Sequence, residues 1–179
     1  MRTLLITALA ACTLALPACT NHPSAITRDI AIVEPGLTGD WLTPDGDIVR
    51  IAGGWPASDY MLEVTTAEGN EAMPMRVATV RGSRVMEVLV TKPTADNPPV
   101  YHYSKVTIAG NAITSQPINP EWLEAQAVDG TGVVGSRTES GKFVAAVSDP
   151  GRMMLLLERA ATDPRAWLPS ERLTRVNSR

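Results

Sequence analysis

Tight-turn sequences recur along this 179-residue chain and separate short runs that are rich in β-branched residues. Gly, Asn and Asp favour turn conformations, and each run between two turns has the length of a single strand. The turns are expected at Asp45-Gly46, Gly53-Gly54, Glu68-Gly69-Asn70, Gly82-Ser83, Gly110-Asn111 and Ser140-Gly141. This spacing predicts an antiparallel meander of about six to nine strands.

Two of these turns are predicted to close hairpins. The first hairpin pairs residues 75–80 with residues 84–90 across Gly82-Ser83. Because glycine comes first in this two-residue loop, we expect a type II′ turn. The second hairpin pairs residues 100–108 with residues 112–115.

Two helices interrupt the strand pattern. Residues 119–126 begin with Asn119 as N-cap and Pro120 at the first helical position. The second helix opens at Asp149-Pro150 and ends at Asp163-Pro164. Its buried face is expected to comprise Met153, Leu156, Leu157, Ala160 and Ala161, widened by Met154 and Leu155. A buried strand over residues 153–157 is the alternative, and a last strand over residues 171–176 would return to the sheet.

The sequence therefore predicts a mainly β fold: a curved antiparallel sheet or partly open barrel with one or two short helices, which is α+β by count. A chain of 179 residues has the length of one domain. The formal net charge of −3 lacks the basic character that binds phosphate backbones, so nucleic acid is not expected as a partner.

The first residues have the pattern of an export signal. Arg2 precedes an uncharged apolar run that ends at residue 18 and is shorter than the roughly 20 residues that cross a bilayer. The run closes with Leu16-Pro17-Ala18-Cys19, which resembles the lipobox of bacterial lipoproteins. The resemblance implies cleavage before Cys19, lipid on that cysteine, and sorting to the outer membrane because Thr20 rather than Asp follows.

Three alternatives to this processing remain open. Leu9-Ala10-Ala11-Cys12 is a second match to the lipobox pattern, an ordinary secretory signal would be cut after Ala18, and the segment could stay uncleaved. The preferred organisation is a signal over 1–18, the lipidated cysteine and a polar tether over 19–29, and a single domain over 30–179. The mature chain would keep only Cys19 and form no internal disulfide.

The mature domain offers little that resembles catalytic chemistry. His102 has Ser104 on the same face of its predicted strand, but two such side chains lie too far apart for a nucleophile and its base. Residues 135–142 only superficially resemble a phosphate loop, and we find no metal-ligand motif. We therefore expect neither an enzyme nor a cofactor.

The segment Leu37-Thr38-Gly39-Asp40-Trp41 resembles the Gly-x-Trp opening strand of lipocalins. In that family the tryptophan closes one end of an eight-stranded barrel and packs with a basic residue from a late strand. The resemblance thus implies a lipocalin-like barrel in which Arg172 or Arg175 contacts Trp41.

Such a barrel would have an apolar interior. The candidate ligand-lining residues are Trp41, Met61 or Leu62, Met75, Met86 and Val88. The alternative is that these residues pack against the 150–161 helix. Trp55 lies in an expected loop and is either an exposed contact residue or folded back onto the sheet.

The leading hypothesis is a non-enzymatic outer-membrane lipoprotein, facing the periplasm, that binds an apolar small molecule or lipid. The alternative is an envelope adaptor that binds a partner protein through a sheet edge or an exposed loop. The first predicts an apolar cavity of a few hundred Å³; the second predicts a filled core and an exposed apolar patch. A third hypothesis, an esterase-like enzyme, requires a hydroxyl or carboxylate within reach of His102.

Overall fold

The computed structural model describes residues 18–21, 24–54, 58–66, 69–92, 94, 99–128, 133–137, 143–147 and 149–176. The strands are β1 (Ala18–Asn21), β2 (Gly39–Leu42), β3 (Ile48–Gly53), β4 (Tyr60–Thr66), β5 (Gly69–Val80), β6 (Ser83–Thr91), β7 (Val100–Ala109), β8 (Ala112–Pro117), β9 (Val133–Arg137), β10 (Phe143–Val147) and β11 (Glu171–Arg175). The helices are α1 (Pro120–Val128), α2 (Pro150–Thr162) and a short 3-10 helix, η1 (Pro164–Ala166).

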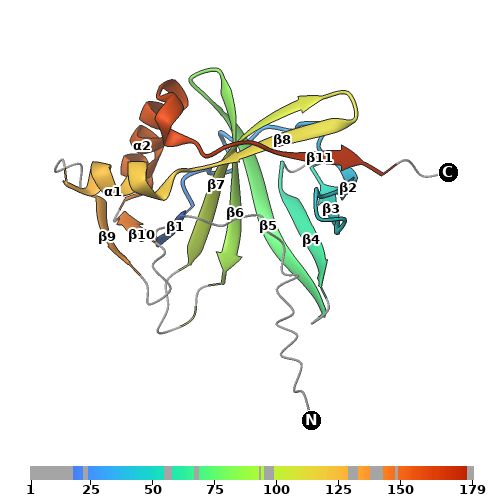
Figure 1. The fold of residues 1–179 in the computed structure, drawn as a ribbon. Coiled ribbons are helices and arrows are strands. Elements are labelled where there is room, and N and C mark those ends of the chain that lie inside the picture. The colour runs from blue at the N-terminus through green and yellow to red at the C-terminus, as the bar shows by residue number, and fades with distance from the viewer. Residues whose placement is uncertain are drawn as a thin grey trace, which may run out of the picture.

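Eight antiparallel strands close into a lipocalin-like barrel (Figure 1). The strand order is β6-β5-β4-β3-β2-β11-β8-β7, and the two ends of this order meet because β7 pairs with β6. Closure removes the free edges that an open sheet would leave. The structure thus confirms the mainly β prediction and shows that the barrel is closed.

Three further strands extend the sheet beyond the barrel. The first residues of β7 pair with β1, β1 pairs in parallel with β10, and β10 pairs with β9. The sheet therefore contains eleven described strands, more than the six to nine expected. The backbone of Cys19 belongs to this extension, opposite His102 on one side and Val144 on the other.

The turn of the β5–β6 hairpin differs from the sequence prediction. Val80 pairs with Ser83, so the two loop residues are Arg81 and Gly82 rather than Gly82 and Ser83. Both have positive φ, 48° and 81°, which identifies a type I′ turn instead of type II′. The predicted loop would have placed Arg81 opposite Arg84; the observed register places Arg84 opposite Thr79 and avoids this like-charge pair.

The second hairpin is confirmed, with Ala109 opposite Ala112. Both predicted helices are also confirmed. Asn119 Oδ1 accepts a hydrogen bond from the Glu121 N–H at 3.0 Å, and Asp149 Oδ1 accepts one from the Gly151 N–H at 2.9 Å. These bonds satisfy amide groups that a helix start leaves without intrahelical partners.

The buried face of α2 comprises Met153, Leu156, Leu157 and Ala160, as predicted for a helix and not for a strand. Leu155 is 61% exposed, so the prediction that it widens this face is wrong. The expected last strand is β11, which completes the barrel between β2 and β8.

Buried apolar side chains form two separate cores. One fills the barrel and includes Trp41, Val49, Leu62 and Ile113. The other lies outside the barrel, where side chains of α1 and α2 pack with side chains of β5, β6, β7 and β10. Figure 1 shows both helices next to β9 and β10. The wall of the barrel is thus buried on both faces over part of its surface.

Candidate functional site

All five candidate ligand-lining residues lie inside the barrel. Trp41, Leu62, Met75 and Val88 are at most 5% exposed, and the partly buried Met86 packs against them. Because neighbouring residues of a strand face opposite sides, Leu62 points inward while Met61 is exposed on the outer face. The alternative that these residues pack against the 150–161 helix is wrong, because that helix belongs to the outer core.

Trp41 is fully buried in the barrel interior. Its indole Nε1 donates to the Leu37 carbonyl at 2.9 Å, and the Arg175 guanidinium lies 4.3 Å from the ring centroid. Arg175 also donates to the carbonyls of Gly36 and Thr38, both at 2.8 Å. Of the two arginines proposed from the sequence, Arg175 is therefore the partner of Trp41 and Arg172 is not.

The interior contains side chains rather than a wide chamber at these positions. The interior cluster draws residues from all eight barrel strands. Close packing of this kind leaves few voids larger than a water molecule. A bound apolar molecule at the candidate residues would have to displace side chains that now contact one another.

His102 also faces the barrel interior, because it pairs with Val88 while Ser104 pairs with Met86. His102 is 4% exposed, and its Nε2 has no hydrogen-bond partner in the described chain. Burial lowers the pKa of His102 to about 4, so the imidazole is neutral at pH 7. The nucleophile–base pair that the esterase hypothesis requires is not formed by these described residues.

The described chain offers no site of a kind that metals prefer. Among these residues, no three His, Cys, Asp or Glu side chains gather closely enough to hold an ion. Likewise, none of the described helices has the length and apolar character needed to cross a bilayer. The phosphate-loop-like segment 135–142 is only partly described, and its residues 135–137 belong to strand β9. Trp55 lies outside the described residues.

The side chain of Glu87, on the outer face of β6, binds the segment that precedes the barrel. Glu87 is 3% exposed, and its Oε2 accepts hydrogen bonds from the backbone N–H groups of Ala25 and Ile26 at 2.8 and 3.2 Å. The Ser24 hydroxyl donates to Oε1 at 2.5 Å, and the Tyr103 hydroxyl donates to Oε2 at 2.6 Å. Four donors therefore compensate the burial of this carboxylate.

Residues 24–26 are consequently part of the folded domain. Ala25 and Ile26 are buried in the outer core, although residues 20–29 were predicted to be a polar tether. Burial and the Glu87 charge raise the pKa of Tyr103 well above its usual value, so its hydroxyl remains a donor at neutral pH. The domain thus begins at least six residues before the predicted boundary at residue 30.

A second set of charges continues this network along the outer face. Arg76 donates from Nε to Asp59 Oδ1 at 2.7 Å and from Nη1 to the Ile26 carbonyl at 3.1 Å. Arg28 donates from Nε to Asp59 Oδ2 at 2.9 Å. The hydrogen bond from Arg76, followed by the nearby positive charges, holds the pKa of Asp59 below its usual value.

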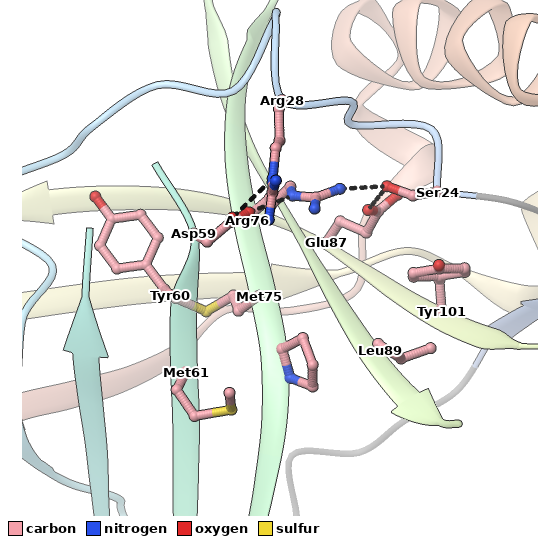
Figure 2. A pocket seen from close by; sticks show the side chains of 11 residues that line it. Ser24, Arg28, Asp59, Tyr60, Met61, Met75, Arg76, Glu87, Leu89 and Tyr101 are labelled. Atoms are coloured by element: carbon pink, nitrogen blue, oxygen red, sulfur yellow. Dashed lines mark hydrogen bonds and ion pairs between the residues drawn. The ribbon is translucent and has the colours of Figure 1, made fainter. Parts of the chain in front are cut away.

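These charged residues form one side of a groove of about 270 Å³ on the outer face of the barrel. Figure 2 shows Arg28, Asp59, Arg76 and Glu87 together on one side, with Met61 and Leu89 on the other. The groove combines an apolar floor with a polar rim, the usual make-up of a small-molecule site.

Sequence reasoning missed this groove because it placed the site inside the barrel. The signal that could have found it is Glu87, a lone acidic residue within the apolar strand 85–90. In the observed register Arg76 stands directly opposite Glu87, whereas the predicted turn would have paired Arg76 with Leu89. A search for favourable cross-strand charge pairs would have selected the observed register.

Fold and site together define a small closed β-barrel protein with a packed interior and a groove on its outer face. No family model, no curated protein and no solved structure matches the chain.

Proposed function

We propose that this chain is a non-enzymatic lipoprotein of the bacterial outer membrane that faces the periplasm and acts as an adaptor for a partner protein. The lipid would be attached to Cys19, as the lipobox-like sequence over 16–19 suggests. The pattern of the first residues, which is typical of an export signal, and a cysteine followed by Thr20 support this assignment.

The observation that carries the adaptor function is the packed interior. Trp41 and Met75 are no more than 2% exposed and contact the other interior side chains. A carrier with its ligand inside the barrel needs a preformed cavity of a few hundred Å³ at these positions. The packed interior favours binding on the outside of the molecule.

The sheet extension supplies an edge for such binding. In the described chain β9 is the last strand of the order, and its outer side pairs with no other described strand. Val134 of this strand is 69% exposed. A free edge presents backbone N–H and C=O groups that an extended partner segment can pair with, and Val134 offers it an apolar contact.

Photocrosslinking tests this proposal in the full chain. A photoreactive amino acid at position 137, at the end of β9, should give one discrete protein adduct in cells. Val134→Lys should lower its yield about tenfold, because a charged side chain on an edge strand disfavours pairing. Leu155→Lys is the matched control, since Leu155 is an exposed apolar residue on α2.

The control variant should retain the adduct, because position 155 lies on a helix away from the edge. Equal adduct yields in the wild type and in Val134→Lys would contradict docking at β9. Absence of any adduct from position 137 would contradict it as well.

The binding of an apolar ligand or lipid remains a second candidate function. One observation favours it, the groove between the charged network and the exposed outer-face residues. This would move the ligand from the barrel interior, where the sequence placed it, to the outer wall.

A further inference from the structure

Two rows of side chains cross the outer face of the barrel, one above the other. The first row is polar: Arg76 pairs with Glu87, and Glu87 pairs with Tyr103. The second row lies two residues further along these three strands and also extends onto β4. It consists of Met61, Pro74, Leu89 and Tyr101, contributed by β4, β5, β6 and β7 in turn.

The second row is an apolar floor that the rest of the described chain leaves partly uncovered. Met61 is 36% exposed, and Pro74, Leu89 and Tyr101 are only partly buried. With strands about 4.8 Å apart, a row over four strands spans about 14 Å. The floor is therefore long and narrow, with the shape of an extended hydrocarbon chain rather than of a compact ring system.

The charged side of the groove decides which head group fits. Both carboxylate oxygens of Asp59 accept hydrogen bonds from arginines, and both oxygens of Glu87 are occupied as described above. In contrast, Nη1 of Arg28 and Nη2 of Arg76 have no hydrogen-bond partner in the described part of the chain. The unused groups on this side are thus guanidinium N–H donors, which bind carboxylate and phosphate oxygens.

Arg28 is well placed to receive such a group. Its side chain is 75% exposed and lies at the lip of the groove, above Asp59 (Figure 2). Arg76 is 26% exposed and lies deeper. Because Asp59 already bridges the two guanidinium groups, an anionic head group would bind their remaining N–H donors, with its chain along the apolar row.

We propose that this groove binds a single acyl chain with an anionic head group. The proposal is independent of the β9 edge and of the lipid on Cys19. The ligand can be a free amphiphile or one chain of a membrane phospholipid, because both present the same chemistry. The second source is close at hand if the chain is anchored, since Thr20 of β1 pairs with Tyr101 of the groove.

Photolabelling of the full chain in purified membranes tests the site. The first probe is dodecanoate with a diazirine near the end of its chain, below its micelle concentration. We expect the label on the peptides that contain Met61 and Leu89. Unlabelled dodecanoate should suppress the label, and dodecyltrimethylammonium, which has the same chain with a cationic head group, should not.

Two variants and a control make the test specific. Arg28→Gln should require about tenfold more dodecanoate for the same suppression, because it removes a charge-assisted hydrogen bond. Met61→Gln should weaken labelling through the lost chain contact. Ile48→Gln is the control, because Ile48 is an exposed apolar residue on the outer face of β3, and its labelling should match the wild type.

A second experiment distinguishes the two sources of the ligand. It uses phosphatidylglycerol that carries the same photoreactive chain. Labelling by either probe supports the site and identifies where its ligand comes from. Equal suppression by the cationic amphiphile, or unchanged competition in Arg28→Gln, overturns the anionic head group. Absence of labelling by both probes, with a crosslinker at position 89 capturing a protein instead, overturns the site in favour of a protein contact.

Discussion

Burial of an imidazole inside the barrel makes the stability of this protein depend on pH. His102 binds a proton in the folded state only near pH 4, whereas in the unfolded chain it does so near pH 6.5. Between these values the unfolded state holds more protons, so the free energy of unfolding falls as the pH falls. Well above pH 6.5 the imidazole is neutral in both states and contributes no pH dependence.

This linkage gives the first prediction. Urea unfolding of the wild type at pH 7.5 and pH 4.5 should differ by a contribution from His102 of about 2–3 kcal/mol. His102→Leu keeps an apolar side chain in the site and should abolish that contribution, although other groups will still titrate. An equal pH difference in the wild type and the variant would show that His102 is not buried in the neutral form.

At the scale of elements, the register of β11 determines which of its arginines contacts Trp41. It carries two arginines, Arg172 and Arg175, of which only Arg175 stacks on Trp41 and donates to two backbone carbonyls. Register, not composition, distinguishes them: Arg175 pairs directly with Trp41, while Arg172 faces outward opposite Thr114. Alternation along the strand then sets the direction of each side chain.

The second prediction compares these two arginines. Arg175→Met should lower the free energy of unfolding by about 2 kcal/mol, because it removes the cation–π contact and the donors to the Gly36 and Thr38 carbonyls. Arg172→Met should change it by less than about 0.5 kcal/mol, as is usual for an exposed substitution. Denaturant unfolding at one pH measures both, and equal losses would refute a stabilising role for the contact between Arg175 and Trp41.

Local signals predicted the elements better than their pairing. Caps and periodicity located both helices, and turn pairs located most hairpins, because these features depend on neighbouring residues. The β5–β6 register was wrong because Arg81 takes a positive φ that a non-glycine residue seldom adopts. The predicted register paired Arg76 with Leu89 instead of Glu87, so it did not indicate the charged network on the outer face.

At the scale of the whole molecule, barrel closure and the place of residues 24–26 depend on contacts between residues far apart in the sequence. Closure requires β11, the last strand, to pair with both β8 and β2, and no local pattern specifies its pairing with β2 at the far end of the chain. The role of residues 24–26 likewise depends on Glu87, more than 60 residues away. The predicted interior residues were correct as core positions because inward alternation is local, but whether a barrel is packed or hollow depends on all eight strands together.

The proposed anchor has a structural consequence at this scale. The backbone of Cys19 pairs with His102 and Val144, and Ser24 is already bound to Glu87. A lipid on Cys19 would therefore join the sheet directly and hold the barrel at the membrane surface, without a long tether. More than one acyl chain makes such attachment stable, at about 0.8 kcal/mol per buried CH₂.

The last prediction tests the anchor with a matched pair of cysteines. In the wild type, mass spectrometry of the membrane-extracted protein should find an acylated N-terminal peptide that begins at Cys19. Cys19→Ala should lose acylation and membrane retention, because the thiol that receives the lipid is gone. Cys12→Ala should keep both, since Cys12 would be removed with the signal; the opposite result would assign processing to the second lipobox-like sequence over 9–12. A soluble, unacylated chain that begins at Cys19 would instead indicate plain secretion, in which case the barrel would have no fixed orientation to a membrane.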